Sequence, residues 1–573
     1  MVYAVVVAWL VVAATVVLSW NRLDTDRGWR GFVLTLTLGL SLLHQLLFAT
    51  VTEDALVTFR YAQNIADGNG PVFNPGERVE GYTNFLWLVL IALPRAAFGA
   101  DVRTTAIVLG VLAALGCVLL SCFLVNRTVA AATPDGAEPR PAIGVAAAVL
   151  TASAGGLAVY GASGSEVPLF VLLVLAVGYS LAARRPVVAG VLVAFAVMTS
   201  PEGLVVGVLA GLWLAGAALK RKHTWWAPVG YLLGALVFLI PRLAWRATFY
   251  QHFLPAPLAA KLGAPLGAQL AAGWPYLSGF ALAHQGFLLL GLVAAVALLL
   301  RRTDAVEAPN AAAASRVARP QERTGTATEA RALIGLLFAT AVGLAAAAVV
   351  TGGDPGPSWR LLAPVPPLLA VGALAAYGVL TAGLAGKPSP RPKPSPAGTR
   401  LVPVAACGLA GIAVLVSVFS PEMLDRVRDW RAHGIELAEI GGWLGDYLPP
   451  GSVVSAAAPG ALAAHGGQLL IVDVFGRTDD HIARDGQHDG GVATDYDYVV
   501  NGRRPAVAVP DAGYGDRQHC AIDPVYAGKY QVATFRRVGT PYWVSVYPRA
   551  EEAKALVADL DKGPDFRYVP CPS

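Results

Sequence analysis

The run TTAIVLGVLAALGCVLLSCFLV, residues 104–125, contains no charged side chain. A stretch of this length can cross the apolar core of a bilayer, which is about 30 Å thick. Comparable apolar runs recur as far as residue 419. They cover residues 1–20, 32–50, 141–160, 226–245, 279–300, 332–350, 361–384 and 401–419. A signal peptide accounts for one such run, whereas this series predicts a polytopic α-helical membrane protein.

The composition agrees with that class. Hydrophobic residues make up 55% of the chain and charged residues 14%, with a mean hydropathy of +0.55. Soluble domains carry roughly 25% charged residues, so an ordinary soluble enzyme is excluded. Of the five cysteines, Cys117, Cys122 and Cys407 lie in apolar runs and are expected to be inert core residues. Cys520 and Cys571 lie in the polar C-terminal part, and we predict that they pair if that part faces an oxidising compartment.

Basic loops indicate the topology, because Lys and Arg collect on the cytoplasmic side. The short segment FLWLVLIALPRAAF, residues 85–98, contains Pro94 and Arg95 and is predicted to be re-entrant or interfacial. The sequence then predicts about twelve spans, counting short helices near 187–199 and 203–219, with both termini outside. The basic loops placed inside are 21–30, 184–185, 220–223, 301–331 (a disordered linker) and 385–400 (with a polyproline spacer at 387–396). The segments placed outside are 51–84, 161–166, 199–203, 246–278, 351–360 and everything after 420.

The first outward loop, which begins at Thr52, is rich in polar residues. Residues 53–66 are predicted to form a helix that Thr52 caps and that Gly68 and Gly70 end. Glu53 and Asp54 in its first turn either complement the helix dipole or carry function. Function is favoured because the pair directly follows a spanning helix. Further polar residues share its helical face or crowd the same loop: Arg60, Asn64, Glu77, Arg78, Glu80, Tyr82 and Asn84.

Every other outward loop also carries an ionisable residue. The segments are SGSEVPLF (163–170), TSPEG (199–203), RATFYQHFLPAPLAAKLG (246–263) and TGGDPGPSWR (351–360). Taken singly, each residue is explained as a helix cap or a surface group. Together they predict one outer cavity lined by carboxylates and cations. The residues concerned are Glu166, Glu202, His252, Lys261, Asp354 and Arg360.

Such a cavity suits transfer from a lipid-phosphate-linked sugar. Arg and Lys would bind the phosphate and stabilise it as it leaves, and a carboxylate would accept the proton of the acceptor hydroxyl. A soluble nucleotide donor is disfavoured because neither a P-loop nor a GxGxxG motif occurs, and nothing points to nucleic acid. A divalent cation (Mg²⁺, Mn²⁺ or Ca²⁺) bridging Asp54 and the phosphate stays open.

The stretch 52–87 resembles the GT-C class of polyprenyl-phosphate-sugar glycosyltransferases. Within that class it is most similar to the branch containing the terminal β-(1→2) arabinofuranosyltransferase of mycobacterial and corynebacterial arabinan synthesis. The resemblance rests on Glu53-Asp54 followed by FRYA (59–62), on GNGPVFNPGERVEGYTNFLW (68–87), and on SGSEVPLF, SPEG, LPAPLAAK and GGDPGPSWR in that order. The chain departs from the pattern at Glu53, where Asp is frequent, at Ser165 in place of Leu, and at Thr199 in place of Arg.

The resemblance implies a multi-pass plasma (inner) membrane enzyme. Its implied donor is decaprenyl-phosphoryl-arabinose and its acceptor an extracytoplasmic envelope glycan of the arabinogalactan or lipoarabinomannan type. Asp54 is the implied catalytic carboxylate, and Glu53 is the second catalytic candidate. The implied donor-binding residues are Arg60, Asn64, Lys261, Arg360, His252 and Asp354. The implied loop-shaping or acceptor-binding residues are Glu77, Arg78, Glu80, Tyr82, Asn84, Glu166 and Glu202.

Residues 420–573, which follow the predicted membrane domain at 1–419, are expected to form an extracytoplasmic α/β domain of ordinary size. The segment 459–467 is predicted to be a short helix or turn. Asp473, Asp479, Asp480 and His481 indicate either a metal or glycan site or, with better odds, a solvated turn. The predicted strands are SVVSAAA (452–458), QLLIVDVF (468–475), YDYVV (496–500), PAVAVP (505–510), YQVATFRRV (530–538) and YWVSVY (542–547).

Two other functions are compatible with these patterns. The same fold could transfer another polyprenyl-phosphate sugar, such as mannose, to a protein, lipid or other polymer. A transporter or a non-catalytic membrane protein affecting the envelope or motility belongs to a different class. The chain shows no two-half inverted repeat of the kind many transporters have, and its polar loops lie on one side. These features favour the enzyme.

Overall fold

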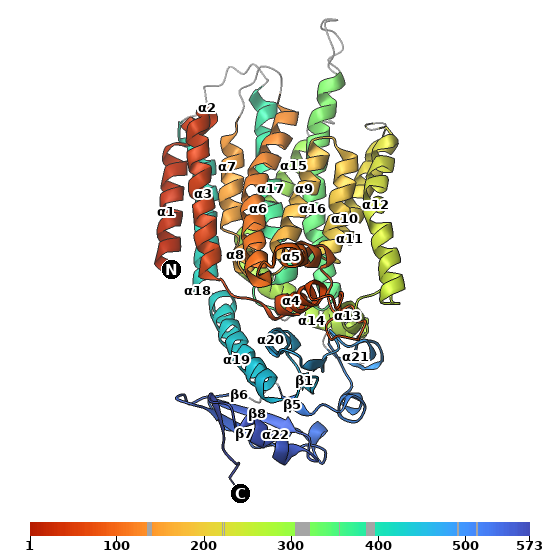
Figure 1. The fold of residues 1–573 in the computed structure, drawn as a ribbon. Coiled ribbons are helices and arrows are strands. Elements are labelled where there is room, and N and C mark those ends of the chain that lie inside the picture. Colours follow the sequence, from red (N-terminus) through yellow and green to blue (C-terminus); the bar gives the residue numbers. More distant parts are fainter. Residues whose placement is uncertain are drawn as a thin grey trace, which may run out of the picture. The chain divides into compact units, whose positions relative to one another are not determined.

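The computed structural model describes residues 1–133, 140–220, 222, 224–303, 321–354, 356–385, 396–489, 492–510 and 514–572. The chain divides into two compact units, and Figure 1 shows their elements. The helical unit comprises Met1–Ala49, Ile107–Arg242 and Gly273–Val427. The mixed unit comprises Thr50–Ala106, Leu243–Ala272 and Arg428–Ser573. Most of the predicted C-terminal domain (420–573), from residue 428 on, is thus joined in the mixed unit by two segments of the predicted membrane domain.

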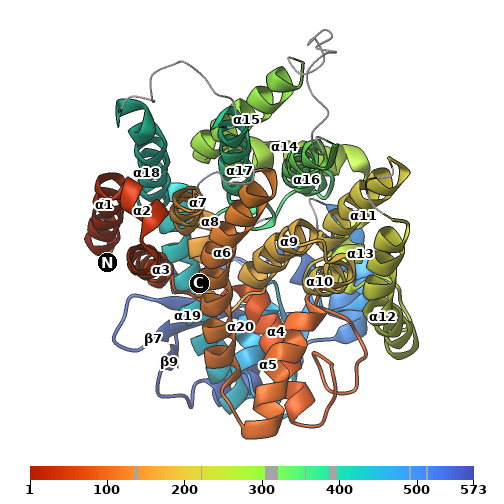
Figure 2. The same ribbon diagram turned by 90° about the horizontal axis from the view of Figure 1, so that it is seen from above.

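Long apolar helices make up most of the helical unit, which Figure 2 shows nearly end on. Six helices among the described residues are long and apolar enough to cross a membrane: α3 (Arg27–Leu47), α6 (Val102–Ala132), α12 (Trp226–Phe249), α16 (Gln321–Val350), α17 (Val365–Ala385) and α18 (Pro396–Phe419). Two bent pairs raise this number to eight: α7 (Ala142–Ala152) with α8 (Gly155–Gly161), at 63°, and α14 (Leu266–Ala283) with α15 (Gln285–Thr303), at 86°. The protein is therefore a membrane protein.

The predicted number of twelve spans requires four more helices to cross. The described part of the chain holds five shorter apolar helices: α1 (Val2–Leu18), α5 (Phe85–Phe98), α9 (Val167–Ala182), α10 (Pro186–Thr199) and α11 (Gly203–Leu219). Of these, α5 alone lies in the mixed unit, where it packs against α4 (Glu53–Ala66). The number twelve, and a non-spanning role for 85–98, stay predictions.

Three membrane-domain predictions differ from the structure. The runs 141–160 and 279–300 do not form straight helices, because each belongs to a bent pair; the first breaks before Gly155 and Gly156, which are poor helix formers. The linker predicted at 301–331 is shorter, since α15 continues to Thr303 and α16 begins at Gln321. Its middle part, and residues 387–395 of the predicted polyproline spacer, lie outside the described residues.

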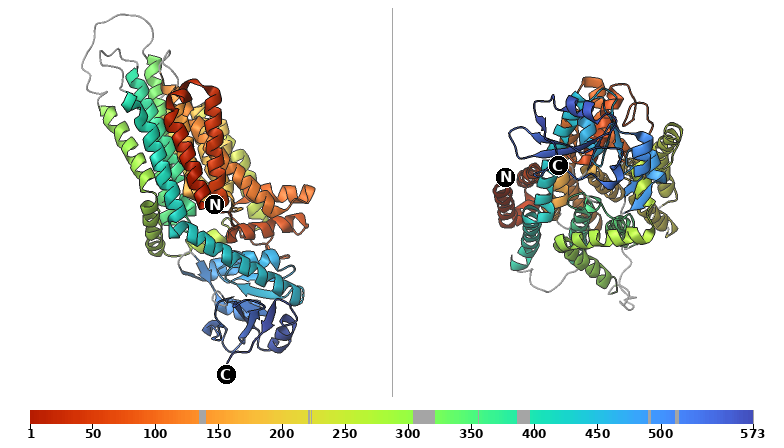
Figure 3. Two further views of the ribbon diagram at one scale, coloured as in Figure 1. Left: turned by 90° about the vertical axis from the view of Figure 1, so that its left-hand side faces the viewer. Right: turned by 90° about the horizontal axis from the view of Figure 1, so that it is seen from below.

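The mixed unit is built on one mixed sheet, blue in Figure 3, in the order β2-β1-β5-β8-β7-β9, with β6 beside β8. Strands β1 and β2 run parallel, as do β1 and β5, whereas β8, β7 and β9 are antiparallel. The strands are β1 (Val453–Ala456), β2 (Leu470–Asp473), β5 (Val507–Val509), β6 (Tyr514–Gly515), β7 (Ala533–Arg537), β8 (Trp543–Pro548) and β9 (Phe566–Tyr568), beside a hairpin of β3 (Gln487–Asp489) and β4 (Val492–Thr494). The helices are α13 (Ala256–Leu262), α19 (Arg426–Tyr447), α20 (Pro459–His465), α21 (Asp480–Asp485) and α22 (Ala553–Leu560).

One predicted strand, YDYVV, is wrong. Residues Tyr498–Arg503 form a helical turn instead. The Asp495 carboxylate accepts a hydrogen bond from the backbone N–H of Tyr498 at 2.9 Å, and the Asp495 carbonyl accepts one from Val499 at 3.0 Å. This cap starts a helix and overrides the strand preference of the aromatic and β-branched residues that follow.

A buried cluster explains why α13 belongs to the mixed unit although it lies 200 residues away in sequence. Ala256 and Ala260 of α13 pack against Val472, Val474 and Ile482 around β2 and α21. The small alanines let α13 approach the sheet closely.

Farther along the chain, Cys520 and Cys571 form the predicted disulfide, with Cα atoms 5.7 Å apart.

Candidate active site

The carboxylate of Glu53 caps a second helix. Its oxygens accept hydrogen bonds from the backbone N–H groups of Gly460 and of Ala461, the latter at 3.1 Å, in the first turn of α20. Helix α4 and α20 come so close here that a Cβ on Gly460 would lie 2.6 Å from the Glu53 carbonyl oxygen and 3.0 Å from the Val57 nitrogen. Position 460 therefore requires glycine. Because both Glu53 oxygens are engaged, Asp54 is the better candidate for chemistry within the pair.

A cation that the sequence analysis did not single out, Arg477, lies beside this pair. It follows β2 and donates through Nη2 to the Ala457 carbonyl oxygen in the turn that leads to α20. Burial opposes the charged form of Arg477, but the charges of Asp473, Asp54 and Glu53 outweigh it and raise its pKa. The turns after β1 and β2 thus place a guanidinium next to two carboxylates, at the carboxyl ends of parallel strands, where α/β sheets generally bind ligands.

Burial raises the pKa of Glu53 to about 7, although Arg477 and the N–H groups of Gly460 and Ala461 favour its ionised form. The unfolded chain loses this proton near pH 4.5. Between pH 4.5 and 7 the folded protein therefore binds more protons than the unfolded one. The contribution of Glu53 to the free energy of unfolding is therefore largest at low pH and decreases as the pH rises from 4.5 to 7.

We accordingly expect Glu53 to make the free energy of unfolding of the wild type decrease from pH 4.5 to 7 relative to a protein without this carboxyl group. Glu53→Gln, which cannot ionise, should flatten this part of the profile. Thermal unfolding of both proteins in detergent across this pH range measures the difference. Identical slopes for the two would contradict the role given to Glu53.

Residues 68–74, after α4, are held by side-chain amides. Asn64 donates to the Val72 carbonyl at 2.8 Å and the Phe73 carbonyl at 2.9 Å. Buried Asn74 pairs with both backbone groups of Ile471 in β2, at 3.0 Å and 2.9 Å, as a neighbouring strand would. Asn64 thus has a structural role here, and its donor-binding role stays a prediction.

Arg60 likewise has a structural role. Its guanidinium donates to the carbonyl oxygens of Phe73 at 3.3 Å, Gly467 at 3.0 Å and Leu469 at 3.4 Å. These bonds tie the middle of α4 to the turn before β2. Three of the five guanidinium N–H groups of Arg60 therefore bind backbone oxygens. Its role in binding the donor phosphate stays a prediction.

The predicted loop-shaping residues hold the segment 77–84 in place. Glu77 pairs with Arg503, Arg78 lies 5.0 Å from the Phe249 ring centroid, and Asn84 exchanges hydrogen bonds with Thr58. Tyr82 contacts the Tyr250 hydroxyl at 3.1 Å. Each of these contacts lies inside the mixed unit.

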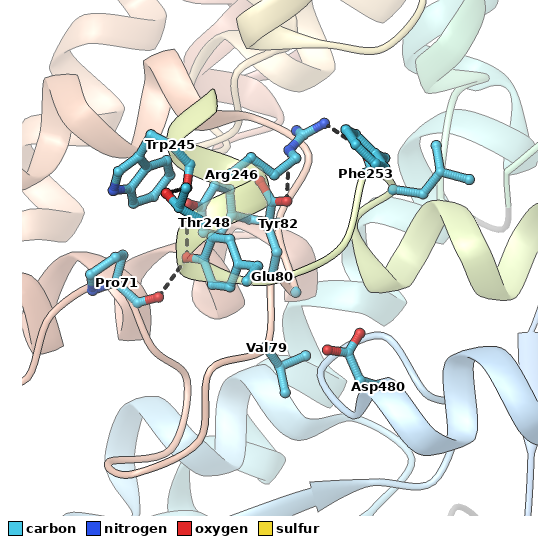
Figure 4. Close-up of polar contacts among 12 residues, drawn as sticks. Pro71, Val79, Glu80, Tyr82, Trp245, Arg246, Thr248, Phe253 and Asp480 are labelled. Atoms are coloured by element: carbon cyan, nitrogen blue, oxygen red, sulfur yellow. Dashed lines mark hydrogen bonds and ion pairs between the residues drawn. The ribbon is translucent and has the colours of Figure 1, made fainter. Parts of the chain in front are cut away.

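Glu80 forms a buried ion pair with Arg246 near the end of α12 (Figure 4). The Glu80 Oε2 to Arg246 Nε distance is 2.8 Å, and the side chains are only 3% and 17% exposed. Arg246 also donates to the Phe253 carbonyl at 3.1 Å, and the Glu80 carbonyl accepts from Ala256 at the start of α13. Glu80 therefore connects the first outer loop to α12 and α13.

Removing the Glu80 charge should destabilise the protein strongly. Glu80→Gln leaves a buried guanidinium without its counterion, which costs about 3–5 kcal/mol. Glu551, 71% exposed, supplies the matched control, and Glu551→Gln should change stability by about 0.5 kcal/mol or less. Chemical unfolding in detergent measures both variants. A loss below about 1 kcal/mol in Glu80→Gln would refute the buried pair.

His252 and Lys261 also lie in the mixed unit. His252 Nε2 is 3.8 Å from the Asp480 carboxylate, and Asp480 also pairs with Arg484 at 3.1 Å. Lys261 is in the last turn of α13, where its backbone carbonyl accepts from Gln269. Four other predicted residues, Asp354, Arg360, Glu166 and Glu202, lie in the helical unit.

Within the helical unit, Asp354 binds Arg360 at 2.6 Å and accepts the N–H of Gly356 at 2.8 Å. Glu166 is buried at the start of α9, and Glu202 at the start of α11 accepts from Ser200. The predicted residues therefore divide between two units, and the mixed unit collects those of the first outer loop.

Internal hydrogen bonds to Asp473, and not contacts with solvent, hold the loop DVFGRTDDH in place. Asp473 is fully buried and accepts hydrogen bonds from the N–H groups of Phe475 (3.0 Å), Arg477 (2.7 Å) and Thr478 (3.1 Å). Asp479 caps α21. The solvated-turn interpretation is wrong for Asp473, whose buried oxygens shape the loop.

The side chains around Asp54 bear on whether a metal ion could bind there. In the described part of the chain no three His, Cys, Asp or Glu side chains are grouped as ligands. Both Glu53 oxygens accept backbone N–H groups, and Arg477 brings a positive charge to the position that a cation would neutralise. A divalent cation at Asp54 stays a prediction.

The architecture is that of known membrane glycosyltransferases. The chain is similar to ArnT from Cupriavidus metallidurans in the apo state, with a TM-score of 0.51, 15% identity and coverage of 91% of this chain and 98% of that one. ArnT bound to undecaprenyl phosphate gives the same TM-score at 13% identity, covering 92% and 99%. Archaeoglobus fulgidus AglB, in complex with an inhibitory peptide and a dolichol-phosphate, matches at 0.51 with 11% identity, covering 91% and 75%. The chain has the GT-C fold.

Sequence relatives point to one branch. The terminal β-(1→2)-arabinofuranosyltransferase of Corynebacterium glutamicum is 27% identical over 281 residues, which is 44% of this chain and 39% of that protein. Its Mycobacterium tuberculosis namesake is 40% identical over 73 residues, 12% of each chain. The matches thus span less than half of these relatives. Residues 426–547 match a domain of unknown function, DUF8728. The predicted resemblance to GT-C glycosyltransferases is confirmed.

Proposed function

We propose that this protein is a polyprenyl-phosphate-sugar glycosyltransferase. The observation that carries the proposal is the convergence of Asp54, Glu53 and Arg477 at the carboxyl ends of β1 and β2, in a chain with the GT-C fold. The names of the relatives support arabinofuranose as the sugar, and the proposed donor is decaprenyl-phosphoryl-arabinose. An envelope glycan of the arabinogalactan or lipoarabinomannan type is the acceptor that this choice implies.

In the proposed reaction Asp54 accepts the proton of an acceptor hydroxyl. The hydroxyl oxygen bonds to the anomeric carbon of the sugar while the bond from that carbon to the phosphate oxygen breaks. Polyprenyl phosphate leaves with the bonding electrons, and a neighbouring cation stabilises its added negative charge. A single displacement inverts the anomeric centre. A β-linked donor giving a β-linked product would instead require Asp54 as nucleophile or ion-pair stabiliser.

The proposed reaction uses no divalent cation, since the described residues group no three His, Cys, Asp or Glu side chains as ligands. Activity measured after dialysis against EDTA tests this directly. Turnover that disappears with EDTA and returns with Mg²⁺, Mn²⁺ or Ca²⁺ would require a metal step.

The deciding experiment uses purified protein with several labelled polyprenyl-phosphate sugars and a set of glycan acceptors, followed by linkage analysis. Transfer from decaprenyl-phosphoryl-arabinose to an arabinan supports the proposal in full. Transfer of mannose to protein, lipid or polymer would keep the enzyme class and change the substrate. No turnover with any donor would favour a transporter or non-catalytic protein.

The proposal also places the active site, and with it the C-terminal domain, outside the cytoplasm. We expect single cysteines introduced in 99–103, after α5, to react with an impermeant thiol reagent added outside intact cells. Cysteines in 184–185 should react only after the membrane is opened. Labelling of 99–103 from the cytoplasmic side alone would overturn this topology.

A further inference from the structure

We propose that Arg477 binds the phosphate of the lipid-linked donor beside Asp54, and that Asp473 is the residue that positions Arg477 for this task. The inference rests on the proposed function. It gives Arg477 the kind of role that the sequence suggested for Arg60, three of whose five N–H groups bind backbone carbonyl groups.

The position of Arg477 comes from the sheet. Ala457 and Gly460 follow β1, Arg477 follows β2, and these parallel strands end at the same edge. Glu53 binds the first of these turns at Gly460, and Arg477 binds it at Ala457. These two contacts, with residues three positions apart in one turn, therefore bring the guanidinium and the acidic pair together.

The loop that carries Arg477 is unusually well fixed. The buried Asp473 carboxylate receives three backbone N–H groups from residues 475–478 and lies 3.4 Å from Arg477 Nε. The first outer loop packs on the same residues, since a Cβ on Gly81 would lie 2.9 Å from the Arg477 carbonyl oxygen and 2.7 Å from Thr478 Cγ2. A preformed loop loses little conformational entropy when a ligand binds.

Arg477 keeps donors for a ligand. Its Nε and Nη2 are used by Asp473 and Ala457, whereas Nη1 has no hydrogen-bond partner among the described residues, and the side chain is 27% exposed. A guanidinium fits phosphate oxygens through parallel N–H donors, which a lysine does not match. As the phosphate leaves the sugar and gains charge, this cation is positioned to stabilise it.

The test measures lipid binding, which does not depend on the sugar or the acceptor. Full-length protein in nanodiscs is titrated with decaprenyl phosphate and with decaprenol, in wild type, Arg477→Gln, Arg477→Lys, Asp473→Asn and the control Arg536→Gln, an exposed arginine of β7. We expect Arg477→Gln to weaken decaprenyl phosphate binding about 10- to 100-fold, the range of a charge-assisted contact, with decaprenol unchanged. Asp473→Asn should weaken it less, and Arg536→Gln should match the wild type.

Arg477→Lys keeps the positive charge beside Glu53 and Asp54 and serves if Arg477→Gln does not fold. A loss of about 3- to 10-fold is expected for it, since the fork geometry is removed. Wild-type affinity in a folded Arg477→Gln or Arg477→Lys protein would overturn the inference, as would misfolding of both variants, which assigns Arg477 a structural role alone.

The remaining outcomes separate this inference from the proposed function. If the wild-type protein does not bind decaprenyl phosphate, the proposed function itself is refuted. Equal binding of decaprenyl phosphate and decaprenol by the wild type overturns only the phosphate site. Inorganic phosphate at millimolar concentration should not displace decaprenyl phosphate, and displacement would make Arg477 a site for free anions instead of the donor.

Discussion

Asp54→Asn is expected to lower the rate of sugar transfer about 10²- to 10⁴-fold while the protein stays folded, because Asn neither accepts a proton nor carries charge. Glu53 cannot readily replace it, since both Glu53 oxygens accept N–H groups of α20. If Asp54 only complemented the dipole of α4, the same change would cost roughly 0.3–1 kcal/mol of stability and leave turnover near normal.

Turnover with the donor that the linkage experiment identifies, together with thermal unfolding, distinguishes these cases. Asp67→Asn is the matched control, since Asp67 is an exposed carboxylate at the other end of the same helix. It should remain within about twofold of the wild-type rate. Glu53→Gln should reduce the rate less than Asp54→Asn and act mainly on stability. A folded Asp54→Asn protein with most of its activity would remove Asp54 from the reaction and make Glu53 the next candidate.

Gly460→Ala should have the second-largest effect. A Cβ at this position would lie 2.6 Å from the Glu53 carbonyl oxygen and 2.8 Å from Glu53 Oε1, so α4 and α20 must move apart. The start of α4 carries the acidic pair, and a displacement of about 1 Å at a catalytic group costs roughly 10²-fold in rate. We expect a loss of about that size.

Gly442→Ala is the control for this change. Gly442 lies in α19, and a Cβ there would meet nothing within 4 Å. Alanine should therefore be neutral or slightly stabilising at that position. Rates and thermal unfolding of the two variants are compared side by side. Wild-type turnover in Gly460→Ala would show that the contact of α4 with α20 does not position the reacting groups.

Much of the local structure could be predicted from the sequence. Helix α4 begins and ends where Thr52, Gly68 and Gly70 indicated, and α5 covers the predicted 85–98. The core strands β1, β2, β5 and β7 lie inside predicted segments, and β8 extends one residue beyond its predicted segment. These features depend on hydrophobic pattern and on turn residues, which act between neighbours in the sequence. YDYVV failed because the Asp495 cap is a side-chain contact that outweighs the pattern.

The roles of individual polar residues were harder to predict. Arg60 was expected to share a helical face with Glu53, but it binds carbonyl groups about 400 residues away, and Asn64 binds those of the loop that follows its own helix. The sequence did not single out Arg477, which lies within a polar run. The position of Asp473, directly after a buried strand, was a signal that could have indicated the loop containing Arg477. Whether a guanidinium meets a carbonyl, a carboxylate or a ligand depends on groups hundreds of residues away, and spacing along the chain carries no such information.

By itself the sequence determined that this is a membrane protein with the GT-C fold and an acidic pair after an early spanning helix, because apolar length and local motif are properties of contiguous residues. Tertiary structure alone decided that Glu53 caps α20, that Gly460 must be glycine, and that Arg477, paired with Asp473, lies beside Asp54. Those outcomes follow from the approach of α4 to the ends of two parallel strands, where close packing and buried charge select partners that are about 400 residues apart in sequence.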